Sequence, residues 1–330
     1  MTSRFLVTAE IPEPGLSILR EAGEATVLPE LPSPERLTEL LASGDYDAVI
    51  TQMADKVTPD ALKDAKVKGI SNYAVGFNNI DVEAATERGI GVSNTPGVLS
   101  DATADIAFLL LLSVARRLRE ADELVRSGQF KGTGPMFMLG HDVTGQTLGL
   151  AGFGRIARAM ARRALGFGMN VVFSPRPPLE REVSEEELGE FAGRVEQKPW
   201  DEIVETADYI SLHVPLTDDT KHLIDADALS RMKKTAILVN TARGPVVDEA
   251  ALVEALNTGA IAGAGLDVYE AEPALADGLA EAPNTVLLPH IGSATEQTRS
   301  TMAEMVARDA IAMARGEKPE NPVNPEVFGG

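Results

Sequence analysis

The chain has 330 residues, of which 44% are hydrophobic, and no cysteine, so it can form neither disulfides nor thiolate-bound metal sites. This length is enough for two domains, each with its own core. The formal net charge of −20 at pH 7 repels polyphosphate, which excludes nucleic acid as an expected partner.

The N-terminus leads directly into a predicted strand, without a signal-peptide pattern. The longest apolar run, 106–115, is about half of the ~20 residues needed to span a bilayer, so we expect no membrane partner. A cytoplasmic location without a bound metal is the expectation.

The first third of the chain alternates β-rich and helical patterns, as in a small parallel α/β unit. Helices are expected at 33–43 and 58–65. The predicted strands are 5–8, 48–51 and 70–73, with shorter candidates at 27–28 and 92–93.

After the break at 94–97, Ser100 or Asp101 is expected to cap one long helix that continues to Val125. A second α/β series begins at Thr147, and the acidic segment 180–191 is expected to form a solvated helix. A final helix at 294–314 should return to the N-terminal domain. The predicted strands of the second series are 147–151, 170–174, 209–213, 236–240, 262–267 and 286–288.

A glycine motif, Gly152-Phe153-Gly154-Arg155-Ile156-Ala157, lies between the strand 147–151 and a predicted helix. Gly152 permits a tight turn, and Gly154 lets backbone N–H groups approach a pyrophosphate at the helix N-terminus. Ala157 is small enough for the helix to pack against the strand. The strand–turn–helix context favours dinucleotide binding over a turn without a ligand.

The turn after strand 170–174 indicates which nucleotide is bound. An acidic residue there binds the ribose 2′-hydroxyl of NAD, but this chain has no acid between Phe173 and Pro178. Arg176 could pair with a 2′-phosphate, which favours NADP(H). If Arg176 faces solvent instead, NAD(H) remains possible.

Three polar residues follow successive predicted strands of the second series: Arg243, Glu272 and His290. Because ligands of open α/β sheets bind at the carboxyl ends of strands, these side chains can converge on one small molecule. Of the four histidines, His290 is the best candidate for acid–base chemistry, whereas His222 is expected at a helix start.

Over nearly its whole length the chain resembles the D-isomer-specific 2-hydroxyacid dehydrogenases, most closely the glyoxylate/hydroxypyruvate reductase branch. The resemblance is carried by the glycine motif and by the stretches 101–105, 240–244, 263–268 and 289–295. It implies two Rossmann/flavodoxin-like parallel-sheet domains: a substrate domain of residues 1–100 and 291–330, and an inserted NAD(P)-binding domain of residues 101–290.

The resemblance also implies roles for individual residues. Arg243 would bind the substrate carboxylate and polarise its 2-oxo group, His290 would donate a proton, and Glu272 would favour the imidazolium form. Substrate contacts are expected from Met53, Val75 and Gly76, besides Arg243 and His290. The expected cofactor contacts are Thr103, Gly152, Phe153, Gly154, Arg155, Ile156, Pro175, Arg176, His213, Val214, Pro215, Thr220, Thr241, Ala242, Asp267 and Gly292.

The implied activity is NADPH-preferring reduction of glyoxylate to glycolate and of hydroxypyruvate to D-glycerate, by a homodimer. The alternatives are an NAD-linked phosphoglycerate or phosphite dehydrogenase, and a non-catalytic NAD(P)-sensing protein resembling the corepressors built on this fold. Departures from the reductase pattern at Met53 and Phe137 bear on side-chain preference and on intersubunit contacts.

Overall fold

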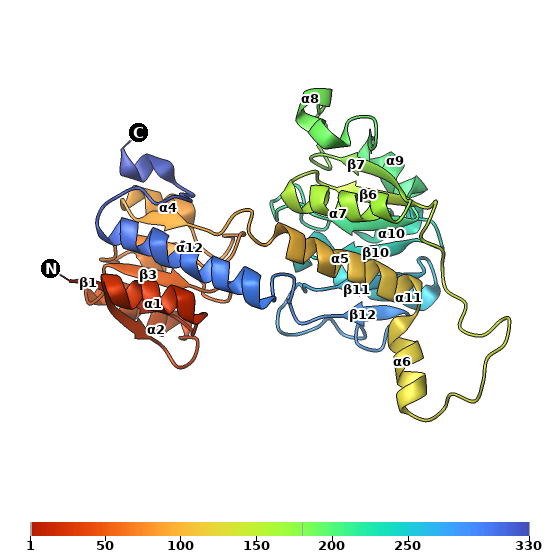
Figure 1. The fold of residues 1–330 in the computed structure, drawn as a ribbon, viewed down its shortest axis with the longest axis horizontal. Coiled ribbons are helices and arrows are strands. Elements are labelled where there is room, and N and C mark those ends of the chain that lie inside the picture. Colours follow the sequence, from red (N-terminus) through yellow and green to blue (C-terminus); the bar gives the residue numbers. More distant parts are fainter. Residues whose placement is uncertain (1, 180, 330) are drawn as a thin grey trace. The chain divides into compact units, whose positions relative to one another are not determined.

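The computed structural model describes residues 2–179 and 181–329. The chain forms two compact units (Figure 1): Met1–Leu99 with Ser293–Gly330, and Ser100–Gly292. Both are built on parallel sheets with helices on the two faces. No helix in the described ranges is long and apolar enough to cross a membrane.

The first unit contains a five-stranded parallel sheet in the order β2-β1-β3-β4-β5. Its order reverses between β1 and β3, which creates the kind of switch point where α/β sheets bind ligands. The strands are β1 (Ser3–Val7), β2 (Gly23–Val27), β3 (Ala48–Thr51), β4 (Gly69–Asn72) and β5 (Gly91–Ser93). Four of them were predicted to within two residues at each end, whereas the candidate at 27–28 shares only Val27 with β2.

Two helices cover one face of this sheet and pack against each other: α1 (Glu13–Ala22), which was not predicted, and α12 (Glu296–Ala314). The predicted return of the last helix to the N-terminal part of the chain is confirmed. The other helices are α2 (Pro34–Ser43), α3 (Pro59–Leu62), α4 (Val82–Glu87) and the 3₁₀ turn η3 (Pro325–Phe328).

The segment after α12 adds an edge contact to the sheet. Val323 donates its N–H to the Val92 carbonyl over 2.7 Å, and Val92 donates to Oδ1 of Asn324 over 2.7 Å. Asn324 is buried and also binds the Ile90 carbonyl. The two ends of the chain are therefore joined in one core.

The second unit contains a seven-stranded parallel sheet in the order β12-β11-β10-β9-β6-β7-β8. Its order reverses between β6 and β9, as in doubly wound dinucleotide-binding folds. The strands are β6 (Thr147–Ala151), β7 (Asn170–Ser174), β8 (Glu196–Gln197), β9 (Tyr209–Leu212), β10 (Ile237–Asn240), β11 (Gly263–Leu266) and β12 (Thr285–Leu287). Six were predicted to within one residue at each end; only the short β8 was not.

Helices form layers on both faces of this sheet. On one face α5 (Ser100–Ala115) packs against α7 (Arg155–Gly166). On the other lie α9 (Trp200–Thr206), α10 (Ala226–Arg231) and α11 (Glu249–Thr258). The acidic segment forms only a short helix, α8 (Glu185–Leu188), and a turn η1 (Gly189–Phe191), while Glu180 lies outside the described residues.

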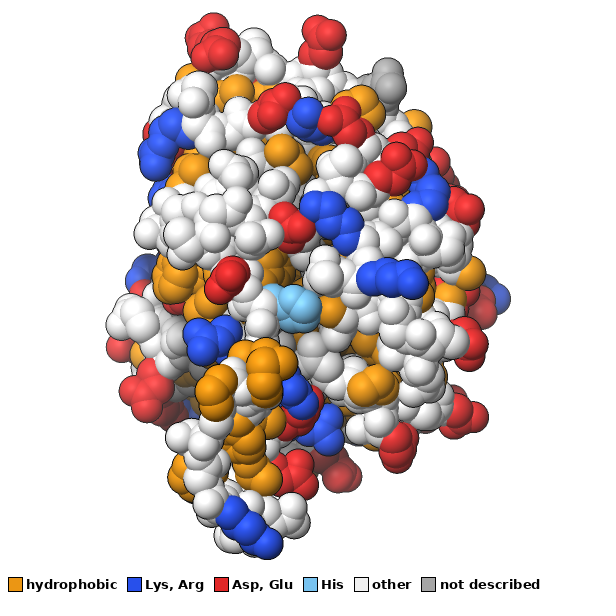
Figure 2. Space-filling model, turned by 90° about the vertical axis from the view of Figure 1, so that its right-hand side faces the viewer, with side chains coloured by type: hydrophobic (Ala, Val, Ile, Leu, Met, Phe, Trp, Pro, Cys, Tyr) orange, Lys and Arg blue, Asp and Glu red, His pale blue; other side chains and the backbone are white. Residues whose placement is uncertain are grey.

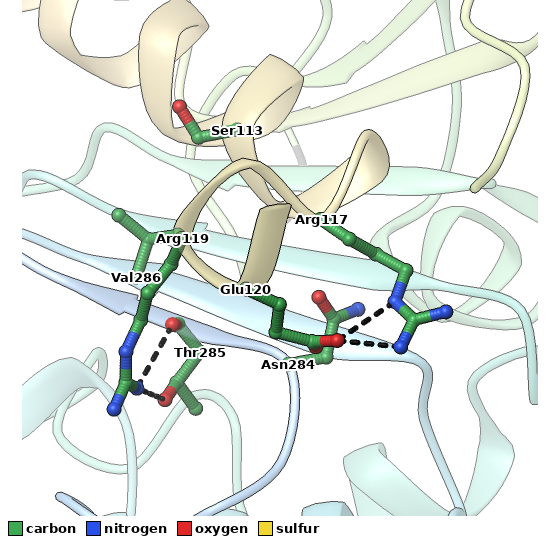
Figure 3. Close-up of a pocket in the computed structure, with 7 residues that line it drawn as sticks. All are labelled: Ser113, Arg117, Arg119, Glu120, Asn284, Thr285 and Val286. Carbon is green, nitrogen blue, oxygen red and sulfur yellow. Dashed lines mark hydrogen bonds and ion pairs between the residues drawn. The ribbon is translucent and has the colours of Figure 1, made fainter. Parts of the chain in front are cut away.

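The prediction of a single long helix up to Val125 is wrong. The chain forms α5, starting at Ser100 itself, and then α6 (Leu118–Arg126), because Arg117 adopts a left-handed conformation with φ 52°. Figure 3 shows the side chains at this break: Arg117 pairs with Glu120 over 2.5 Å, and Arg119 reaches the oxygens of Thr285 on β12. These contacts direct α6 away from the axis of α5.

Candidate functional site

The glycine turn lies at the switch point of the second sheet, between β6 and α7. Gly152 has φ 87°, and a Cβ placed on it would lie 2.8 Å from the carbonyl oxygen of His213, at the end of neighbouring β9. Gly154 is the N-cap of α7, and a Cβ there would meet open space. The turn therefore leaves a helix N-terminus accessible beside the sheet, which fits a dinucleotide pyrophosphate.

The side chains of the motif divide into buried and exposed ones. Phe153 stacks on Phe173 with ring centroids 4.0 Å apart, so only its backbone is available to a ligand. Ala157, on α7, is completely buried, as expected for the helix–strand contact. Arg155 is exposed and Ile156 is half-buried at the start of the helix.

The end of β7 lies beside the glycine turn, because the Gly152 N–H donates to the Ser174 carbonyl over 2.8 Å. Beyond it Pro175 is half-buried and Arg176 is exposed. The turn therefore carries an exposed cation and has no acid between Phe173 and Pro178.

The loop after β9 is held by hydrogen bonds between its own residues. Burial lowers the pKa of His213 to about 3, so this imidazole is neutral at physiological pH. The Thr220 hydroxyl donates to the Pro215 carbonyl over 2.6 Å and accepts from the Thr217 N–H over 2.8 Å. Val214 is buried. Thr220 thus shapes the loop with its hydroxyl.

His290 and Glu272 form the central contact of the site. Nδ1 of His290 lies 2.9 Å from Oε2 of Glu272, and Oε1 of Glu272 accepts the Tyr269 N–H over 3.0 Å. Burial acts to raise the pKa of Glu272, but the hydrogen bonds from His290 and Tyr269 outweigh it, so this pKa is lower than usual. The carboxylate therefore stays ionised beside the His290 ring.

The loop that carries Arg243 lies against the loop that carries Tyr269 and Glu272, because their backbones approach closely at Gly244. A Cβ on the adjacent Gly244 would lie 2.0 Å from the Tyr269 carbonyl oxygen, so only glycine allows these two loops to touch. The Asn240 amide donates to the Arg243 carbonyl over 2.9 Å and fixes the turn after β10. Burial lowers the pKa of Arg243, while the charge of Glu272 acts in the opposite direction.

Asp267 anchors the residues that follow His290. Its two carboxylate oxygens accept the N–H groups of Ile291 (2.8 Å) and Gly292 (2.7 Å). Gly292 in turn lies close to Thr103 on α5. Burial raises the pKa of Asp267, and the two amide hydrogen bonds partly offset this. The structure thus brings Thr103, Asp267, Gly292 and His290 together.

His222 does not start a helix, contrary to the expectation. It lies in a turn with φ 51°, and its Nε2 is 2.6 Å from Oε1 of Glu270. Two contributors to the site were not predicted: Tyr269, whose hydroxyl binds the Leu288 carbonyl over 2.8 Å, and Asn240. The position of Asn240 at the end of a strand, two residues before Ala242, is the signal that could have identified it, since its Oδ1 accepts the Ala242 N–H.

The remaining predicted residues lie in three loops, after β3, β4 and β10. Thr241 and Ala242 lie in the turn before Arg243 and are largely buried. Met53, Val75 and Gly76 belong to loops of the first unit, after β3 and β4.

Residues 108–292 match the family model for the NAD-binding domain of D-isomer specific 2-hydroxyacid dehydrogenases. A glyoxylate reductase of Thermococcus litoralis is 48% identical, with 99% of this chain and 98% of the relative covered. A glyoxylate reductase of Korarchaeum cryptofilum is 49% identical, with 99% and 97% covered.

Among solved structures, a glyoxylate reductase from Paecilomyes thermophila has a TM-score of 0.87 at 33% identity, with 98% of this chain and 99% of that chain covered. An NADPH-dependent glyoxylate/hydroxypyruvate reductase from Sinorhizobium meliloti, solved with NADP and malonate, has a TM-score of 0.84 at 33% identity, with 99% and 98% covered. With its doubly wound sheet, its glycine turn and these relatives, the chain belongs to the D-isomer specific 2-hydroxyacid dehydrogenase family.

Proposed function

We propose that this enzyme is an NADPH-preferring reductase of small 2-oxo acids, converting glyoxylate to glycolate and hydroxypyruvate to D-glycerate. The observation that carries the proposal is the His290–Glu272 pair beside the loop of Arg243. Two relatives that are glyoxylate reductases, 48% and 49% identical over 99% of this chain, support glyoxylate as a substrate.

The glycine turn, the N-terminus of α7 and Arg176 would hold the dinucleotide, with Thr103, Asp267 and Gly292 nearer its reactive end. When bound, the nicotinamide supplies the hydride that reduces C2 of the oxo acid. The free N-terminus of α7 supports a dinucleotide, and the position of Arg176 at the end of β7 supports the choice of NADP(H). NAD(H) would be accepted less well.

The chain's own residues account for the acid–base part of the reaction. The Arg243 guanidinium would bind the substrate carboxylate and polarise the 2-oxo group. His290 would donate the proton to the developing alkoxide from Nε2, because its other ring nitrogen, Nδ1, contacts Glu272. We further assign the backbone amides of Val75 and Gly76 to the substrate carboxylate, and Met53 to the substrate side chain.

We also propose a homodimer. α6 has no buried residue, and α6 and the segment after it carry several exposed hydrophobic side chains: Leu118, Val125, Phe130, Met136, Phe137 and Leu139. In Figure 2 hydrophobic side chains gather on the part of the surface that projects at the bottom of the view. An apolar patch of this extent is typical of a protein interface.

Steady-state kinetics test the proposal directly. Glyoxylate, hydroxypyruvate and pyruvate are each assayed with NADPH and with NADH, and we expect the highest kcat/KM with NADPH and glyoxylate or hydroxypyruvate. His290→Ala should lower kcat about 10²- to 10⁴-fold and leave NADPH affinity intact, as measured by fluorescence titration. Tight cofactor binding without turnover of any 2-oxo acid would contradict the proposal.

A further inference from the structure

The loop Tyr73–Asn79 follows β4 at the carboxyl edge of the first sheet, and three successive carbonyls in it are occupied. The Ala74 oxygen accepts the Thr95 N–H over 2.9 Å. The Val75 oxygen accepts Nδ2 of Asn94 over 2.6 Å, and the Gly76 oxygen accepts Nδ2 of Asn72 over 2.8 Å. Two of the three donors are side-chain amides from strand ends.

These carbonyl contacts also determine the direction of the neighbouring N–H groups. A trans peptide is planar, and its N–H points opposite to its C=O. With the three carbonyls turned toward Thr95, Asn94 and Asn72, the amides of the next residues, Val75, Gly76 and Phe77, are directed away from those donors. Successive amides fixed in this way suit an anion.

Asn72 is completely buried, and its hydrogen-bonding capacity is fully used. Nδ2 donates to the Gly76 oxygen and to Oδ1 of Asn79, and Oδ1 accepts from the Thr51 hydroxyl (3.0 Å) and from Nδ2 of Asn79 (3.1 Å). An aspartate of the same size could not donate to Gly76. The position therefore requires an amide.

The same cluster fixes the loop after β3, which contains Met53. Nδ2 of Asn79 binds the carbonyls of Gln52 and Asp55, and the Asp55 carboxylate accepts the Gln52 N–H over 2.7 Å. The loop after β3 and the loop after β4 are thus joined through Asn79 at the carboxyl edge of the sheet. A shift of one loop would disturb the hydrogen bonds of the other.

We infer that Asn72 and Asn94 are positioning residues for substrate binding: by holding the carbonyls of Gly76 and Val75, they direct the backbone amides of residues 75–77 toward the substrate carboxylate. The inference rests on the proposed function, since it concerns the same substrate. It assigns neither asparagine a direct contact with the substrate.

Asn94→Asp tests the inference, because it keeps the size of the side chain but replaces the donor facing the Val75 oxygen with a charged acceptor. We expect KM for glyoxylate to rise about tenfold or more, kcat to change less than KM, and KM for NADPH to stay unchanged. The inhibition constant of oxalate should rise in parallel. Asn94→Ala should raise the same two constants, KM for glyoxylate and the inhibition constant of oxalate, by a smaller factor. Folded Asn72→Asp should raise them by a factor comparable to that of Asn94→Asp.

Asn170→Asp is the matched control, since Nδ2 of Asn170 also donates to a carbonyl, that of Gly145, but in the other unit. It should leave all four constants unchanged. Unchanged glyoxylate KM and oxalate inhibition in folded Asn94→Asp and Asn94→Ala, with an active parent enzyme, would overturn the inference. A parent enzyme that does not reduce glyoxylate would overturn the proposed function instead.

Discussion

His290 adopts φ 54°, a left-handed conformation that few residues other than glycine adopt. Its surroundings compensate for the strain, because Glu272 binds its ring and Asp267 binds the two amides that follow it. Strained residues held by several neighbours are concentrated at functional sites. The backbone conformation thus gives a reason, independent of the ring contact, to regard this histidine as functional.

Glu272→Gln should lower the rate of reduction. Glutamine carries no charge and cannot hold the His290 ring as the carboxylate does, so we expect kcat to be about 10- to 100-fold lower. Because the pKa of Glu272 lies below its ordinary value of 4.5, the carboxylate of the parent enzyme is ionised from pH 5 to 9, and the loss of kcat should extend over this whole range. Steady-state kinetics at several pH values from 5 to 9 measure the effect.

Glu270→Gln is the control for Glu272→Gln, because Glu270 lies two residues away but contacts His222 instead. Its kcat should stay close to that of the parent enzyme. If Glu272→Gln also keeps the parent's kcat, the role given to Glu272 is wrong.

Arg176→Ala should separate the two cofactors. Loss of a cation that pairs with the 2′-phosphate should raise KM for NADPH about tenfold or more and KM for NADH less than about twofold. Arg181→Ala removes another exposed cation, one that pairs with Glu187, and should affect neither. Equal effects of Arg176→Ala on both cofactors would exclude the phosphate contact.

The sequence located the polar residues of the site because strand ends can be read from hydrophobic patterns, and the carboxyl ends of parallel strands share one edge. Contacts made by backbone groups were not predictable in this way. The approach of Gly244 to Tyr269 and the hydrogen bond from Tyr269 to Glu272 depend on how two loops pack, which no local pattern encodes.

Among the elements, the turn between β6 and α7 is the most constrained. Gly152→Ala would place a Cβ 2.8 Å from the His213 oxygen at a left-handed φ, so we expect a loss of roughly 1–3 kcal/mol in unfolding free energy and weaker NADPH binding. Thermal denaturation and cofactor titration measure the two effects.

Gly166→Ala provides the comparison for Gly152→Ala, since Gly166 ends α7 and a Cβ there meets no atom. It should leave cofactor binding unchanged and stabilise the enzyme by up to about 1 kcal/mol. An alanine at 152 that is as well tolerated as at 166 would contradict the geometry of the turn.

The break between α5 and α6 shows the limit of pattern reading at the scale of elements. Residues 116–117 carry no proline or glycine, so the sequence favours a continuous helix. The helix ends because Arg117 turns back to Glu120 while Arg119 binds Thr285 on β12, a residue distant in sequence. A tertiary contact of this kind overrides helix propensity.

At the scale of the whole molecule, the exposed hydrophobic side chains of α6 predict association. The double variant Leu118→Glu, Val125→Glu places two charges on the proposed interface. It should therefore convert the dimer into monomers, as measured by sedimentation velocity. Leu31→Glu, at a similarly exposed leucine of the first unit, should leave the mass unchanged. A monomeric parent enzyme, or a double variant with the parent's mass, would contradict the proposed dimer.

The joining of both chain ends in the first unit has a consequence for biosynthesis. Its core needs α12 and the Val323–Asn324 contact with β5, whereas the second unit is one continuous stretch, Ser100–Gly292. A ribosome therefore synthesises every residue of the second unit before it reaches the last helix of the first. During translation, about two hundred residues are therefore made between the five N-terminal strands and α12. Until α12 follows, the apolar face of the sheet that this helix later covers stays open.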